Sequence, residues 1–159
     1  MEDLSLHILD IVENSIRALA KRIKIRIDEN IEKDWLTVQI EDNGHGMDKE
    51  TVKKAVDPFF TTKTTRRVGL GLPLLEQAAE ETGGKLQITS EVGKKTRIRA
   101  TFRYNHPDRK PLGSIKETLL SLAAGHPEVD FVYEHKRGKT TYRWDTKRIK
   151  DRKNDRSHH

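Results

Sequence analysis

Hydrophobic periodicity switches between helical and strand spacing along this chain, and the order of the switches limits the fold more than any other feature. Apolar residues recur three or four positions apart from Leu4 to about Arg22, which predicts a helix. Charged and aliphatic residues alternate in 24–28 and 36–40, which predicts two half-buried strands. Two helices and two strands are expected to follow, at 48–56, from Pro73 to Gly83, at 85–90 and at 96–104. This order indicates an α+β fold, with helices packed on one face of a mixed sheet.

The last third of the chain has its own pattern. Two prolines in 106–113 indicate a linker, and Ser114-Ile-Lys-Glu117 has the spacing of a helix capping box. Alternating apolar residues in 129–133 and a second strand at 140–144 predict a hairpin. We therefore expect three regions: a main domain at 1–104, a small helix and hairpin extension at 105–145, and a basic, disordered tail at 146–159.

Composition limits the class of protein. The 159 residues are 33% hydrophobic and 35% charged, which suits one polar globular domain with an appendage. The chain has no cysteine, which excludes disulfides, and no apolar run near the ~20 residues of a membrane span. An acidic start, with Glu2 and Asp3, is unlike a signal peptide, so we expect a cytoplasmic protein and no membrane partner. Lys and Arg number 18 against 17 Asp and Glu in 1–104 but 13 against 8 afterwards, so most of the net charge of +6 lies in the last third.

Four short polar motifs punctuate the main domain. Each motif is weak evidence alone. Together they offer a metal ligand, a carboxylate to bind the adenine base, a cationic lid and a glycine turn for the phosphates, which are the groups that ATP requires. They are Asp10-Ile-Val-Glu13-Asn14-Ser15, Glu41-Asp42-Asn43-Gly44-His45-Gly46-Met47, Asp57-Pro58-Phe59-Phe60-Thr61-Thr62-Lys63 and Gly69-Leu70-Gly71-Leu72.

The first motif lies on the first expected helix. Asp10 and Asn14 are four residues apart and therefore share one face of that helix. An Asn carbonyl oxygen is a suitable Mg²⁺ ligand, and a neighbouring carboxylate can order a water or accept a proton. A helix with an outer polar face also needs no function, and this is the more frequent case for a helix considered alone.

The other motifs are loops with two interpretations each. Asp42 ends an apolar strand, where its carboxylate can accept a hydrogen bond from the adenine amine, or it belongs to an ordinary Asn-Gly turn. The glycines of 69–72 precede a helix, where backbone N–H groups attract anions, or they form a flexible entry loop. Lys63, Arg66 and Arg67 can neutralise a γ-phosphate, although exposed cations in a loop are common.

In order, spacing and residue type, the four motifs resemble the N, G1, F and G2 boxes of the GHKL ATPase superfamily, which includes gyrase, heat-shock chaperones, histidine kinases and mismatch-repair proteins. Asp42 follows Asn14 by 28 residues and precedes Gly69 by 27. The Pro-Phe-Phe-Thr-Thr-Lys run is most similar to the histidine-kinase branch. The resemblance covers about residues 4–104 and implies a two-layer α/β sandwich of the Bergerat type that binds ATP and Mg²⁺.

The resemblance also implies a role for each matching residue. Asn14 would bind Mg²⁺, Asp10 stands where hydrolytic members have a water-activating Glu, and Asp42 would bind adenine. The other implied positions are a catalytic lid cation at Lys63, a cation near the phosphates at Arg17, an adenine-pocket lining at Gly44, Gly46 and Met47, a phosphate turn at Gly69, Leu70, Gly71 and Leu72, and a threonine near the adenine at Thr96.

Two departures from the family pattern shape the expected activity. The chain begins at the N-box helix, so the phosphoacceptor is expected on a separate protein partner, as for the anti-sigma serine kinases of the superfamily. Asp10 is shorter than Glu by one C–C bond, about 1.5 Å, and a misplacement of about 1 Å can cost ~100-fold in rate. We therefore expect a protein kinase domain that transfers the γ-phosphate to a partner and is a weak ATPase at most.

Two alternatives remain open at this point. In the first, ATP orders the lid at 61–68 and switches a partner interface without any transfer. In the second, the chain is a nucleic-acid-associated ATPase, because residues 136–156 hold 10 Lys and Arg against 3 Asp and Glu. A solvated basic tail explains that charge more simply, so nucleic acid is the less favoured partner.

Overall fold

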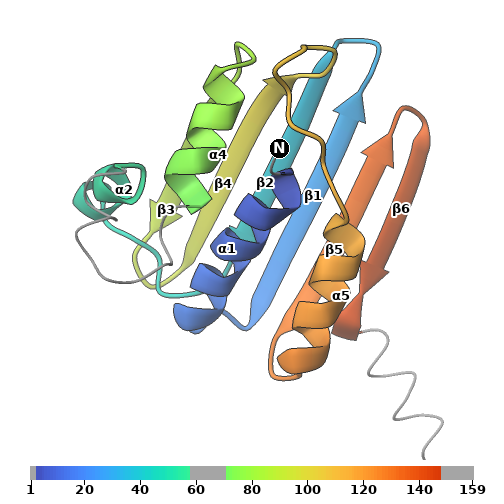
Figure 1. Ribbon diagram of the computed structural model, residues 1–159. Helices are drawn as coiled ribbons and strands as arrows, with labels where there is room; N and C mark the ends of the chain where they lie inside the picture. The colour runs from blue at the N-terminus through green and yellow to red at the C-terminus, as the bar shows by residue number, and fades with distance from the viewer. Residues whose placement is uncertain (1–2, 58–70, 148–159) are drawn as a thin grey trace, which may run out of the picture.

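A single six-stranded mixed sheet forms one layer of the molecule (Figure 1). The computed structural model describes residues 3–57 and 71–147. The strand order across the sheet is β3-β4-β2-β1-β5-β6, and every neighbouring pair is antiparallel except β1 and β5. The strands are β1 (Arg22–Asn30), β2 (Trp35–Asp42), β3 (Lys85–Glu91), β4 (Lys95–Arg103), β5 (Asp130–Arg137) and β6 (Thr140–Asp145).

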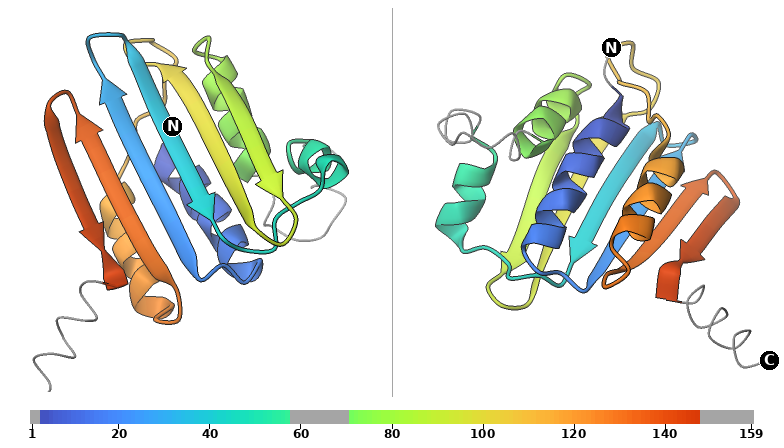
Figure 2. Two further views of the ribbon diagram at one scale, coloured as in Figure 1. Left: turned by 180° about the vertical axis from the view of Figure 1, so that it is seen from behind. Right: turned by 60° about the horizontal axis from the view of Figure 1, so that its bottom comes forward.

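The helices form the second layer and cover one face of the sheet, as predicted, while the opposite face carries no helix among the described residues (Figure 2). α1 and α4 pack beside each other, and α5 lies over β5 on the same side. α2 stands at the β3 edge. The helices are α1 (Leu4–Arg17), α2 (Lys49–Ala55), α4 (Gly71–Glu80) and α5 (Ile115–Gly125). No helix in the described part of the chain is long and apolar enough to span a membrane.

Period-two alternation in the central strands explains why only one sheet face is covered. Ile23, Ile25 and Ile27 of β1 are fully buried beneath the helices, whereas Arg26 between them is exposed. β2 and β4 repeat this pattern, and the amphipathic α1 supplies the facing apolar layer through residues such as Ile8. The sheet and helices therefore share one core.

The first helix is shorter than its apolar spacing predicts. It ends at Arg17, and the extension to Arg22 is wrong because Leu19 takes a positive φ of 60° and the chain enters β1 at Arg22. Leu19, whose spacing matched the apolar face, is 69% exposed. The early end of α1 lets the chain turn directly into the central strand.

The N-termini of α2 and α5 differ in their capping. Asp48, at the start of the helix expected at 48–56, caps α2: its side chain accepts a hydrogen bond from Thr51 N at 2.8 Å, and this bond lowers the pKa of Asp48. Ser114 is the residue before α5, but its side chain makes no capping bond, so the predicted capping-box contact is wrong. The backbone of Ser114, at φ −90° and ψ 62°, lies outside the extended conformation of a usual N-cap.

The predicted C-terminal hairpin continues the main sheet. β5 runs parallel to β1, with Ile25 opposite Tyr133, and β6 turns back along β5. A parallel neighbour needs a crossover, which the linker and α5 provide. The tail that we expect to be disordered lies outside the described residues from position 148 onward.

Candidate nucleotide site

A cavity of about 270 Å³ opens between the helix layer and the ends of β2 and β4. This volume is near the lower end of the range for small-molecule sites. Apolar side chains form much of the wall, and a few polar groups converge in it. The lining residues are Ile11, Asn14, Ser15, Ala18, Asp42, Gly46, Met47, Thr51, Ala55, Leu72, Thr96 and Ile98.

The carboxylate of Asp42 is the polar centre of this cavity. Asp42 ends β2 and falls on the same face as the buried Val38 and Ile40, so the strand alternation places an acid where the next core residue would lie. Its Oδ2 accepts a hydrogen bond of 2.7 Å from the Ser15 hydroxyl, and its Oδ1 accepts one of 2.9 Å from Gly44 N. Only 9% of Asp42 is exposed. These two donors fix the carboxylate and leave lone pairs for a ligand.

Ser15 is a site residue that the sequence prediction missed. It is buried and lies on the core face of α1, one turn after Ile11, so a small polar residue interrupts an apolar stripe. That interruption is the signal that could have identified it. Its bond to Asp42 joins α1 to the end of β2.

The loop after β2 packs closely against the end of α1. His45 N donates to Ala18 O at 3.0 Å, and a Cβ on Gly44 would lie 2.8 Å from the same oxygen, so the approach requires glycine there. Gly46 has a φ of 72°, and a side chain on it would collide with the backbone of Glu91. The two glycines are therefore needed for the course of this loop.

Hydrogen bonds also fix the far wall of the cavity. Met47 N donates to the Ser90 hydroxyl at 2.7 Å, and that hydroxyl lies 2.7 Å from the hydroxyl of Thr96. Thr96 is buried in β4, directly opposite Asp42 in the register of β2 and β4. The predicted residues Met47, Thr96 and Asp42 thus meet at one end of the sheet.

Asn14 lines the cavity from α1, beside Ser15. Its carbonyl oxygen Oδ1 accepts a hydrogen bond of 3.3 Å from the exposed guanidinium of Arg17, one turn along the helix. No group of three or more His, Asp or Glu residues that could hold a metal occurs in the described part of the chain. The Asn14 carbonyl oxygen is itself a ligand type that Mg²⁺ accepts.

The first residues of α4 bring the glycine motif against α1. A Cβ on Gly71 would lie 2.9 Å from Cβ of Asp10 and 3.1 Å from His7 O, so the helices approach closely at this point. Leu72 continues into the cavity wall, whereas Asp10 and Arg17 are not among the lining residues. Lys63, Gly69 and Leu70 lie outside the described residues, as do Arg66 and Arg67.

Chemically, the cavity suits a flat group with apolar faces and a hydrogen-bond donor at its edge. The aliphatic wall can pack against a ring, and the oriented Asp42 carboxylate can accept from an N–H of that ring. Asn14 lies at the side of the cavity that faces α1. This arrangement fits a nucleobase.

Comparison with known proteins agrees with this geometry. The histidine kinase-, DNA gyrase B- and HSP90-like ATPase family matches residues 2–106. The chain belongs to this ATPase family. It contains the ATP-binding domain of that family and is similar in sequence to histidine kinases.

Among its relatives, a putative sensor protein of Shewanella frigidimarina is 34% identical over 103 residues, covering 64% of this chain and 16% of the relative. Sporulation kinase C of Bacillus subtilis is 34% identical and covers 54% of this chain and 20% of the kinase. The Escherichia coli histidine-protein kinase AtoS is 38% identical, and the match covers 54% of this chain and 14% of the kinase. The chain thus spans at most a fifth of the length of these three relatives.

Solved structures confirm the fold. The ATPase domain of Aquifex aeolicus MutL, complexed with ADP, has a TM-score of 0.52 at 20% identity and covers 88% of this chain and 62% of that domain. The topoisomerase IV ATP-binding domain of Francisella tularensis, in complex with an inhibitor, has a TM-score of 0.55 at 16% identity. The match covers 91% of this chain and 87% of that domain. The expected two-layer α+β architecture is therefore that of known GHKL ATPases.

Proposed function

We propose that this ATPase domain binds Mg·ATP in the cytoplasm and transfers the γ-phosphoryl group to a side chain of a separate protein. The observation that carries the proposal is the Asp42 carboxylate, buried in the cavity and held by Ser15 and Gly44. In this arrangement Asp42 accepts a hydrogen bond from the adenine amine. The similarity to sporulation kinase C and AtoS supports a kinase rather than another ATPase.

The remaining roles follow from position. Asn14 offers its Oδ1 to Mg²⁺ through the lone pair that Arg17 does not use, and the exposed Arg17 guanidinium beside it is proposed to contact the phosphates. Gly69 to Leu72 and Lys63 are proposed to contact the phosphates, as the family resemblance implies. Transfer breaks the bond from the γ-phosphorus to the bridging oxygen and forms one to the acceptor, whose proton goes to a base. Asp10 is the candidate base.

A second function, nucleotide sensing without transfer, is favoured by the surroundings of Asp10. A Cβ on Gly71 would lie 3.0 Å from Oδ2 of Asp10, so the carboxylate lies beside the start of α4, and Asp10 is not among the described residues that line the cavity. A carboxylate in that position must turn toward the cavity before it can activate a nucleophile. Under this alternative, ATP changes a partner interface and is retained.

Binding of Mg·ATP tests the site directly. We expect Asp42→Asn to weaken ATP binding by roughly 10- to 100-fold in calorimetry, since hydrogen bonds to charged groups contribute about 1.5–3 kcal/mol. Asp28→Asn, on the helix-free face of the sheet, is the matched control and should leave affinity unchanged. Asn14→Ala should remove the dependence on Mg²⁺. Unchanged affinity in Asp42→Asn would contradict the site.

Transfer is tested separately from binding. Incubation with γ-labelled ATP and a lysate of the source organism should label one partner protein, and at limiting ATP Asp42→Asn should reduce the label by about the same factor as it weakens ATP binding. Binding with neither labelled protein nor released phosphate would support the sensing alternative.

A further inference from the structure

The last strand of the sheet, β6, has a free edge. It is paired only with β5 among the described strands and stands at the end of the sheet order. Gly138, which follows β5, donates its N–H to Glu29 O of β1 at 3.1 Å. The even-numbered residues of β5 therefore direct their N–H and C=O groups toward β1, and the odd-numbered residues of β5 direct theirs toward β6. By the resulting alternation, Thr141, Arg143 and Asp145 direct their N–H and C=O groups away from β5.

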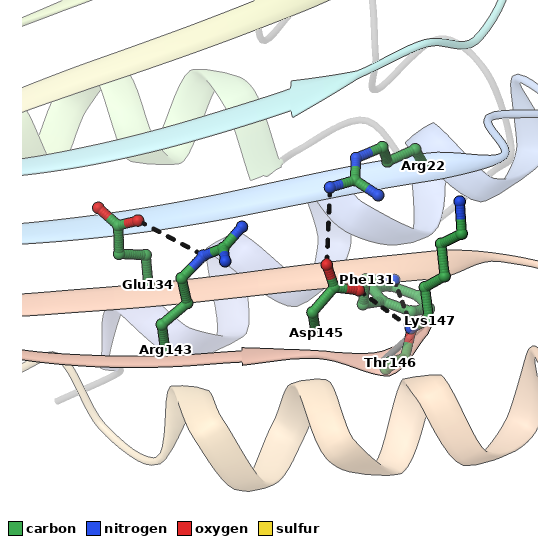
Figure 3. A network of polar contacts seen from close by, with 7 residues as sticks. All are labelled: Arg22, Phe131, Glu134, Arg143, Asp145, Thr146 and Lys147. Carbon is green, nitrogen blue, oxygen red and sulfur yellow. Dashed lines mark hydrogen bonds and ion pairs between the residues drawn. The ribbon is translucent and has the colours of Figure 1, made fainter. Parts of the chain in front are cut away.

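Side-chain contacts hold this edge in place on the helix-free face (Figure 3). Arg143 lies 3.8 Å from the carboxylate of Glu134, and Asp145 lies 3.7 Å from the guanidinium of Arg22. Thr146 closes the end of the pair by accepting a hydrogen bond of 2.8 Å from Phe131 N. β6 is therefore a preformed template for another strand.

The sequence of β6 lacks two usual protections of an edge, a proline and a bulge, and its two charged residues, Arg143 and Asp145, have opposite signs. Natural edge strands are commonly blocked by proline, lysine or a bulge. The strand reads Thr-Thr-Tyr-Arg-Trp-Asp, with no proline, glycine or lysine, and its register with β5 is continuous over all six residues. An edge of this composition favours pairing.

An exposed apolar patch lies beside the same edge, on the side covered by α5. Tyr142 is 43% exposed and Leu120 of α5 is 41% exposed. Lys116 Nζ lies 4.4 Å from the centre of the Tyr142 ring, and Leu120 follows Lys116 by one helical turn. The Tyr142 side chain therefore lies next to the free backbone groups, and Leu120 lies one turn along the helix that contacts it.

We propose that β6 pairs antiparallel with β6 of a second copy of this chain, across a two-fold axis at Tyr142. In this register Lys139 lies opposite Asp145 of the second copy, and Arg143 lies opposite Thr141. A shift of two residues places Arg143 against Arg143 or Lys139 against Arg143, and like charges placed opposite each other are destabilising. The charges of the strand therefore favour this register over the two registers shifted by two residues, and over the full six-residue strand they are complementary to a second copy.

The dimer joins two sheets into one and places the two Tyr142 side chains opposite each other. Its interface lies beyond β5, whereas the nucleotide cavity lies over β2 and β4, so this proposal does not depend on the proposed function. Isologous pairing of this kind closes on itself and does not form filaments.

Charge exchange tests the register in the full-length chain. We expect the wild type to dimerise in sedimentation velocity between about 1 μM and 1 mM, and Lys139→Glu and Asp145→Lys to dimerise about tenfold more weakly alone. An equimolar mixture should regain the dimer, because each heterodimer then has two opposite-charge pairs. A wild type that is monomeric throughout, or a mixture no better than the single variants, overturns the proposal.

A cross-linking test does not rely on charge. The chain has no cysteine, so Tyr142→Cys introduces a single thiol at the proposed axis. Oxidation should link that variant rapidly into covalent dimers. Thr140→Cys, on the same strand and the same face, is the control, because its two copies lie about 14 Å apart in this register. Equal cross-linking rates of the two variants would also overturn the proposal.

Discussion

At the scale of single residues, the site depends on polar groups placed in core positions. Asp42 continues the buried face of β2, and Ser15 interrupts the buried face of α1. Their hydrogen bond of 2.7 Å crosses between the two layers. A buried carboxylate with two fixed donors is held in one orientation, which reduces the ordering required when a ligand binds.

Ser15→Ala tests this orienting role. Removing the hydroxyl leaves Asp42 with one donor, and a typical net hydrogen bond contributes about 0.5–1.5 kcal/mol. We expect ATP affinity to fall roughly three- to tenfold, measured by calorimetry. Ser121→Ala, on the exposed side of α5, is the control. If the affinity of Ser15→Ala equals that of the control, Ser15 does not orient the carboxylate.

At the scale of elements, the close approach of α4 to α1 connects the glycine motif with the helix that bears Asp10 and Asn14. Gly71 permits this approach, because any Cβ would press on Asp10 and His7. The family resemblance assigns Gly71 to a phosphate turn. The structure adds a packing requirement for the same glycine.

Gly71→Ala should therefore destabilise the domain. Overpacking of a close contact costs about 1–3 kcal/mol, so the free energy of unfolding measured with urea should decrease by that amount. Gly125→Ala, at the end of α5 with no atom near its added Cβ, should have little effect. Equal stabilities of the two variants would show that α4 moves away from α1 without cost.

At the scale of the whole molecule, a chain of polar contacts ties the C-terminal hairpin to the central strands. Glu29 of β1 accepts a hydrogen bond of 3.0 Å from the Tyr104 hydroxyl, and His135 Nε2 lies 2.6 Å from its other carboxylate oxygen. His135 Nδ1 lies 2.9 Å from the hydroxyl of Tyr133. Burial, followed by the charge of Glu29, raises the pKa of Tyr133 to about 12.

This pKa predicts a loss of stability at alkaline pH. Between about pH 10, where the unfolded chain releases the Tyr133 proton, and about 12, where the folded chain does so, the unfolded state binds fewer protons than the folded state. The contribution of Tyr133 to stability is full below that window and declines through it. Urea midpoints measured across the window should fall less in Tyr133→Phe than in the wild type. Parallel declines would contradict the raised pKa.

The sequence alone determined the order of elements, the α+β class and the alternation that places Asp42 on the core side of β2. These features are local, because they depend on spacing within single segments. The ATPase family follows from motifs whose order and separation are also visible in the printed chain.

Only the tertiary structure decided which distant segments meet. The Ser15–Asp42 bond, the contact of Gly71 with Asp10 and the parallel register of β1 with β5 join residues far apart in the chain, and no local period encodes such pairings. The same is true of the free edge at β6: a hairpin pattern predicts two strands, but their place at the end of the sheet depends on long-range packing of α5 and β5.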